Sequence, residues 1–166
     1  MNTRATIQDK ILDYIYLTSK KPILLKDMLT ANSQFNEGLY VDSAKLGFRM
    51  KIARAYLVYT GICCLILIPL FGVTHALLAN IDSHVSILGV VMATAGVFIG
   101  FNFFKSKMRD AIALKQIKKA WSVHLPYFPY EKYSVHVEKI YNEAVKKEIQ
   151  KKDLEKYILD NIVKEG

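Results

Sequence analysis

Two long stretches without a charged residue, separated by only five residues, constrain this chain more than any other feature. The first covers residues 55–79 (AYLVYTGICCLILIPLFGVTHALLA) and the second covers residues 85–104 (VSILGVVMATAGVFIGFNFF). As α-helices rising 1.5 Å per residue they would be about 37 Å and about 30 Å long, and the hydrocarbon core of a bilayer is about 30 Å thick. The sequence therefore predicts an integral membrane protein with two membrane-spanning helices.

The link between these stretches, residues 80–84 (NIDSH), is too short for anything but an antiparallel turn. The two spans must therefore form a hairpin. No segment on either side of it has the alternating pattern of a strand, so the predicted fold class is all-α. The expected organisation is a helical N-terminal region (1–54), the first span (55–79), an extracytoplasmic turn (80–84), the second span (85–104) and a basic helical C-terminal region (105–166).

Lysine and arginine residues lie on the two outer sides of the hairpin and are missing from its turn. Residues 1–54 contain nine of them and residues 105–166 contain fourteen, within a formal net charge of +8. Because cations close to a span resist translocation, both termini are expected in the cytoplasm, at the inner membrane if the cell is bacterial. These clusters beside the membrane favour anionic lipid headgroups as a partner over nucleic acid.

Small residues recur on one face of the second span, and a shorter strip lies in the first. They are Gly89, Ala93, Gly96 and Gly100, with Gly72 and Ala76. Small side chains let helix backbones approach closely, which favours association in lipid. The strip indicates either that the hairpin packs against itself or that it assembles with other hairpins or a larger membrane protein. Both interpretations can hold, because each helix has more than one face.

Few polar groups lie in the hairpin. His75, Asp82 and His84 near its outer end could bind a metal or relay protons, but we favour contact with headgroups and water. Hydroxyls such as those of Thr74 and Thr94 could line an oligomeric pore, although bonding back to their own helix is the favoured interpretation. No ionisable residue lies at mid-depth, which argues against an ion-coupled transporter.

The N-terminal region is expected to form helices. Thr6 and Asp9 have the spacing of a capping box. The first helix carries one apolar stripe, formed by Ile7, Ile11, Tyr14 and Ile15. Lys20, Lys21 and Pro22 end or turn this helix, and the following ILLKDML starts another.

The second span is expected to continue as a helix through KSKMRDAIALKQIKKAW, because no Gly or Pro interrupts it. Residues 124–133 (HLPYFPYEKY) contain two prolines and are expected to form a loop. A separate last helix is expected to begin near Asp153. The helix between them has a narrow apolar stripe that an N-terminal helix or another subunit should cover. This stripe consists of Val137, Ile140, Tyr141, Ala144 and Val145.

Basic and aromatic residues after the second span permit an anionic, nucleotide-like ligand or anionic lipid. The candidate residues are Lys105, Lys107, Arg109, Lys115, Lys118, Lys119, Trp121 and Lys132. A solvated helix face explains most of them as well. The sequence indicates no cofactor and no metal site, because its two cysteines, Cys63 and Cys64, are adjacent within an apolar stretch.

Catalytic motifs that a sequence can reveal are absent: there is no P-loop, GxGxxG, HExxH, CxxC or GxSxG. We therefore expect a non-enzymatic protein whose hairpin assembles through small-residue packing and whose cytoplasmic helices bind a partner. The alternative is an oligomeric membrane effector or pore gated by an anionic ligand. Small two-span effectors of bacterial immune signalling have this layout, and the comparison rests on architecture alone.

Overall fold

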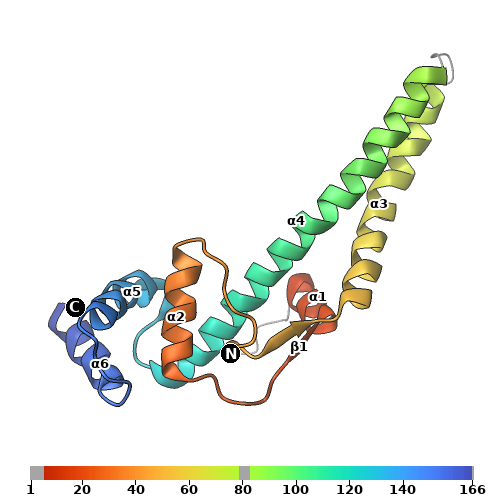
Figure 1. Cartoon of the computed structure of the whole chain (residues 1–166). Coiled ribbons are helices and arrows are strands. Elements are labelled where there is room, and N and C mark those ends of the chain that lie inside the picture. The colour runs from red at the N-terminus through yellow and green to blue at the C-terminus, as the bar shows by residue number, and fades with distance from the viewer. Residues whose placement is uncertain (1–5, 79–82, 166) are drawn as a thin grey trace. The chain divides into compact units, whose positions relative to one another are not determined.

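Six helices make up most of the computed structural model, which describes residues 6–78 and 83–165 (Figure 1). The side chains of residues 75–87 and 165 are not part of that description. The helices are α1 (Ile7–Ile15), α2 (Leu25–Asn36), α3 (Ile52–Leu78), α4 (Ser83–His124), α5 (Tyr130–Lys146) and α6 (Leu154–Glu165). The prediction of an all-helical fold is confirmed in this outline, and α4 does continue well beyond the second apolar stretch.

Two short strands, β1 (Tyr16–Thr18) and β2 (Phe48–Met50), pair in a small sheet. The expectation that no segment forms a strand was wrong here, because three residues are too few to show an alternating pattern. Just beyond the paired strands, the Ser19 N–H donates to the Gly47 carbonyl at 2.6 Å. Gly47 has a φ of +64°, a left-handed conformation that glycine adopts without strain.

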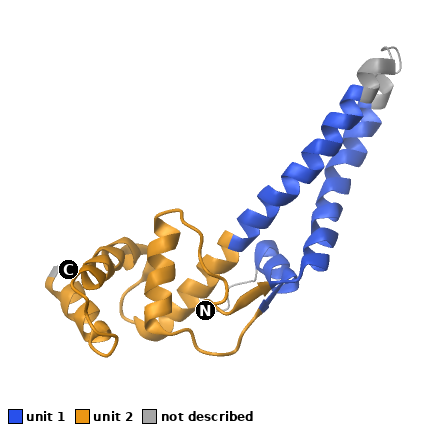
Figure 2. Ribbon diagram, in the orientation of Figure 1, with its two compact units in different colours: residues 1–17, 50–109 blue, residues 18–49, 110–166 orange. Residues whose placement is uncertain are grey.

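The chain divides into two compact units, each built from two separate segments of the sequence (Figure 2). Unit 1 contains residues 1–17 and 50–109, and unit 2 contains residues 18–49 and 110–166. The division falls within β1, β2 and α4. Unit 1 therefore holds α1, α3 and the apolar part of α4, whereas unit 2 holds α2, the end of α4, α5 and α6.

In unit 1 the predicted capping box begins α1. The Asp9 N–H donates to Thr6 Oγ1 and the Thr6 N–H donates to Asp9 Oδ2, both at 3.2 Å. The predicted apolar stripe was only partly right, because Leu12 and Ile15 are buried whereas Ile7 is 79% and Tyr14 44% exposed. Tyr14 instead lies under the guanidinium of Arg54 at the start of α3, 4.9 Å from the ring centroid.

The core of unit 2 joins α2, α4, α5 and α6. Its buried side chains are Met28, Leu29, Ala120, Trp121, Leu125, Val137, Ile140, Tyr141, Ala144, Leu154, Ile158 and Ile162. Four of the five residues predicted as the stripe of α5 belong to it. Val145 was wrong, because its side chain is 57% exposed. A separate last helix, α6, is confirmed.

Helix α2 covers the stripe of α5, as one of the two predicted alternatives required. The Asn32 Nδ2–H donates to the Ser134 carbonyl at 2.8 Å, and the Asn36 Nδ2–H donates to Glu138 Oε2 at the same distance. One turn further along α5, the hydroxyls of Thr30 and Tyr141 lie 2.7 Å apart. The pairing is therefore both apolar and specifically hydrogen-bonded.

The loop predicted for residues 124–133 is shorter in the structure. His124 ends α4, and α5 already begins at Tyr130. Pro129 stands at the N-cap of α5 with a φ of −57°, close to the value that helices use, so the proline starts the helix instead of extending the loop.

Candidate functional site

Helices α3 and α4 of unit 1 are long and apolar enough to cross a membrane, and their apolar windows bury none of their residues. The exposed side chains include Leu65, Ile68, Phe98 and Ile99. A soluble protein rarely leaves so large an apolar surface uncovered, because each such side chain gains roughly 1.5–3 kcal/mol on leaving water. This apolar surface is therefore the first candidate site.

One end of the hairpin is closed by aromatic side chains. The rings of Tyr56 on α3 and Phe101 on α4 stack at 4.2 Å between centroids, and Tyr59 lies 5.4 Å from Phe104. The Tyr59 hydroxyl donates to the Val97 carbonyl at 2.7 Å. Residues near the start of α3 meet residues near the middle of α4, and the chain connects the two helices after the other end of α3, so they are antiparallel.

The predicted small residues fall into two groups. Gly100 belongs to the contact between α3 and α4, because a Cβ atom there would collide with the Tyr59 hydroxyl, and Ala93 is half-buried. In contrast, a Cβ atom on Gly72, Gly89 or Gly96 would meet nothing within 4 Å. Ala76 lies outside the described side chains. Three of the small residues are thus not needed for the hairpin itself.

Two threonine hydroxyls of the hairpin bond to their own helices, as favoured from the sequence. Thr74 Oγ1 donates to the Leu70 carbonyl and Thr94 Oγ1 donates to the Val90 carbonyl, both at 2.8 Å. The three ionisable residues predicted near the turn, His75, Asp82 and His84, lie outside the described side chains.

The predicted basic residues are divided between the units. In unit 1, Lys105 and Lys107 are exposed, and the Lys107 ammonium lies 5.5 Å from the centroid of Phe103. Arg109, at the end of unit 1, and Lys115, in unit 2, each already interact with another group of the chain. These residues do not form one site with defined geometry.

In unit 2, Lys118 is engaged within the protein. Its ammonium lies 2.8 Å from Glu131 Oε1 and 5.2 Å from the centroid of Tyr130. The hydrogen bond from Lys118 lowers the pKa of the Glu131 carboxyl, and burial raises the pKa of Tyr130. Lys132 lies over the ring of Tyr133, 5.0 Å from its centroid. The Lys118 charge is therefore neutralised by a neighbour on α5.

Trp121 is not available for stacking on a ligand. Its side chain is only 2% exposed, its Nε1–H donates to the Phe128 carbonyl at 2.6 Å, and its ring packs edge-to-face on Tyr130 at 5.1 Å. The tryptophan therefore stabilises the core of unit 2, and its ring is not open to a ligand, although Trp121 was among the candidate residues for an anionic ligand.

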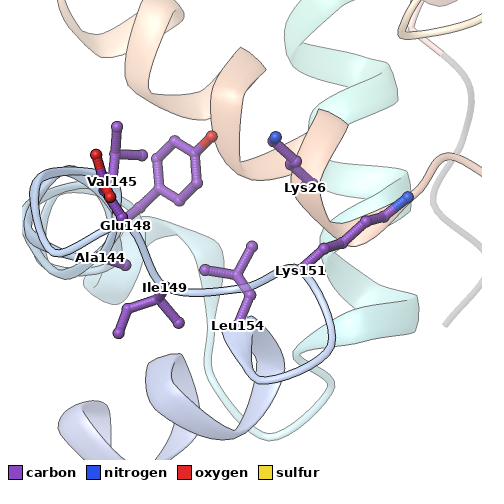
Figure 3. A pocket seen from close by; sticks show the side chains of 8 residues that line it. Lys26, Ala144, Val145, Glu148, Ile149, Lys151 and Leu154 are labelled. Atoms are coloured by element: carbon purple, nitrogen blue, oxygen red, sulfur yellow. The ribbon is translucent and has the colours of Figure 1, made fainter.

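A pocket of about 220 Å³ lies where α2, α5 and the α5–α6 connection meet (Figure 3). Ala144, Ile149 and Leu154 form an apolar part of its lining, and Lys26 and Lys151 add two cations. Glu148 lines it too and brings a negative charge. Its mixed charge gives the pocket no clear preference for one class of ligand.

A smaller pocket contains Lys119, one of the predicted cations, together with residues that the sequence did not single out. Lys20, Lys21 and Gln116 also line this pocket, which has a volume of about 100 Å³. A sequence signal existed on α4, because residues 116, 119, 120, 123 and 124 lie on one helical face. The return of residues 19–23 to that face has no such signal.

Among the described residues, no three His, Cys, Asp or Glu side chains are grouped so that they could hold a metal ion. The His124 Nε2–H donates to the Ile23 carbonyl at 2.8 Å, and His136 is half-buried with an interaction of its own. No protein-family model, curated protein or solved structure matches the chain.

Proposed function

We propose that this chain is a non-enzymatic membrane protein that inserts its hairpin into the bilayer and assembles there with a second copy or a larger membrane protein. The carrying observation is the apolar surface of α3 and α4, which no part of the described chain covers. In a bilayer, lipid chains would cover this surface, so its apolar side chains would not be exposed to water. The charge pattern supports cytoplasmic termini, with unit 2 on that side of the membrane.

Assembly is supported by the small residues that the hairpin leaves unused. Gly72, Gly89 and Gly96 face open space, so another helix could approach the backbone closely at these positions. Unit 2 would meet a cytoplasmic partner through exposed aromatic residues such as Tyr40 and Tyr127. Aromatic side chains are enriched in protein interfaces, which supports this part of the proposal.

The first prediction concerns the unused glycines. Gly89→Leu and Gly96→Leu should weaken self-association roughly tenfold or more, a ratio that corresponds to about 1.4 kcal/mol, because the larger side chain keeps a second helix away. The matched control is Gly61→Leu, since a Cβ atom on Gly61 also meets nothing within 4 Å and lies outside the strip. Light scattering of the full chain in detergent micelles measures the mass of the complex.

Gly100→Leu is a poor probe of assembly, because it would disturb the hairpin itself through Tyr59. The proposal fails if the wild-type chain is a strict monomer and no membrane protein co-purifies with it. It also fails if Gly61→Leu dissociates the complex as strongly as Gly96→Leu. Growth arrest and dye entry on expression, abolished by Gly96→Leu but not by Gly61→Leu, would favour the alternative of a pore-forming effector.

A further inference from the structure

The pocket that contains Lys119 lies in unit 2, between residues 19–23 and the last two turns of α4. Both walls combine polar or basic side chains with apolar ones. The lining residues are Ser19, Lys20, Lys21, Pro22, Ile23, Gln116, Lys119, Ala120, Val123 and His124. No acidic side chain is among them.

The wall formed by residues 19–23 is fixed at both ends. At one end the Ser19 N–H donates to the Gly47 carbonyl at 2.6 Å, and at the other the His124 Nε2–H donates to the Ile23 carbonyl at 2.8 Å. Between them the Lys21 N–H donates to Ser19 Oγ at 3.1 Å. The segment is therefore held against α4 without a ligand, which lowers the entropy that binding would cost.

Three cations of this pocket have no anionic partner. Lys20, Lys21 and Lys119 make no ion pair with any residue that the structure describes, in contrast to Lys118, which is paired with Glu131. All three side chains are exposed, so an anion can approach their ammonium groups without breaking an internal ion pair. The arrangement thus favours a ligand with more than one negative charge.

Gln116 provides an independent indication of a ligand. It is only 5% exposed, it lines the pocket, and its carboxamide makes no hydrogen bond within the described chain. The amide oxygen and nitrogen of Gln116 are not themselves enclosed, so they are open to the solvent of the pocket that the residue lines. Its two N–H donors would be satisfied by the oxygen atoms of a bound anion.

We propose that this pocket binds a phosphate group, presented either by a lipid headgroup or by a soluble phosphorylated molecule. A volume of about 100 Å³ holds one such group and leaves the rest of the ligand outside. The pocket lining contains no Phe, Tyr or Trp side chain on which the ring of a larger ligand could stack. Recognition would therefore depend on charge and hydrogen bonds to the phosphate group. The proposal does not depend on assembly of the hairpin.

The test titrates the full chain in neutral detergent micelles with inorganic phosphate and follows the heat of binding. The triple substitution Lys20→Gln, Lys21→Gln and Lys119→Gln should weaken binding at least about tenfold, the equivalent of one lost charge-assisted hydrogen bond. The control triple, Lys152→Gln, Lys156→Gln and Lys164→Gln, removes the same charge from exposed positions outside the pocket and should bind normally.

Gln116→Leu separates a ligand site from a structural one. The substitution replaces an amide that makes no hydrogen bond within the described chain by an apolar group of similar size, so the ligand-free protein should keep its stability while phosphate binding weakens. If the variant lost both stability and phosphate binding, Gln116 would have a structural role and not a ligand-binding one, and it would no longer support the proposal.

Lipid and soluble sources are distinguished by a second measurement. In this measurement the chain is mixed with phosphatidic acid or phosphatidylcholine and analysed by native mass spectrometry. If the ligand is a lipid, the wild-type chain should retain phosphatidic acid, and the triple variant of the pocket lysines should not. Binding of inorganic phosphate without such retention indicates a soluble ligand. The proposal is overturned if neither probe binds, or if the two triple variants lose binding equally, since that result would reflect net charge alone.

Discussion

At the scale of single residues, the end of α5 has a glutamate where many helices have a glycine. The Ile149 N–H donates to the Ala144 carbonyl and the Glu148 N–H to the Val145 carbonyl, a pattern that requires a left-handed residue at position 148. Glu148 has a φ of 53°. Helix α2 ends in the same way, but the left-handed residue there is Gly38, with a φ of 70°.

These two helix ends give a matched pair of predictions for one mechanism. Glu148→Gly should stabilise unit 2 by about 0.5–1 kcal/mol, because glycine avoids the left-handed penalty but gains freedom in the unfolded chain. Gly38→Ala should destabilise it by about 1 kcal/mol for the opposite reason. Trp121 is the only tryptophan and is buried in unit 2, so its fluorescence in denaturant measures both changes.

If Glu148→Gly instead lowered the free energy of unfolding, the glutamate side chain would have to make a stabilising interaction that outweighs its backbone strain. Its position in the lining of the pocket of Figure 3 is where such an interaction would be sought. A fall in stability would thus contradict the strain argument at this residue.

At the scale of elements, the stability of unit 2 depends on α2 lying over α5. Leu29→Ala should cost about 2–5 kcal/mol, because the Leu29 side chain is fully buried in the core and leaves a cavity. Leu24→Ala, at the exposed residue before α2, should change stability by less than about 0.5 kcal/mol. Equal effects of the two substitutions on the Trp121 unfolding transition would show that α2 does not pack as described.

The sequence predicted those elements that produce a recognisable local pattern of residues. Uncharged length indicated α3 and α4, and helical periodicity indicated the buried positions Val137 and Ile140 of α5. Two predictions were wrong. Tyr14 was predicted to belong to a buried stripe, but its ring lies under the guanidinium of Arg54. Tyr130 was predicted to lie in a loop, but α5 begins there, directly after a proline. In both cases one tertiary or backbone contact outweighs the average behaviour of the residue type.

The sequence did not predict which residues of distant segments contact one another. Nothing in residues 19–23 or 25–36 indicates that they lie against α4 and α5, about a hundred residues later, because these contacts depend on shape and on single hydrogen bonds such as that between His124 and Ile23. The narrow stripe of α5 indicated that an N-terminal helix or another subunit must cover it, but not which of the two or through which residues. The candidate phosphate pocket therefore became visible only in three dimensions.

At the scale of the whole molecule, the composition of unit 2 constrains how the chain can cross a membrane. Residues 18–49 precede the hairpin and residues 110–166 follow it, yet they form one compact unit in which α2 covers α5. If the hairpin is in a bilayer, a shared core requires both flanks to be on the same side. This argument is independent of charge and requires an even number of spans, whereas the lysine and arginine distribution indicates which side it is.

Taken together, the two arguments predict that the turn of the hairpin is outside and the last helix inside, because the shared core puts both flanks on one side and the charge pattern selects the cytoplasmic side. In a chain with Cys63→Ala and Cys64→Ala, Ser83→Cys should react with a membrane-impermeant maleimide in intact cells, whereas Lys164→Cys should react only after the cells are opened. Lys164 belongs to α6, whose buried residues Leu154, Ile158 and Ile162 tie it to the core of unit 2. If Lys164→Cys were labelled in intact cells and Ser83→Cys were not, the topology would be the opposite of the predicted one, and the charge argument would be contradicted. Labelling at both positions in intact cells would mean that the hairpin does not span the membrane, because the shared core places both flanks together.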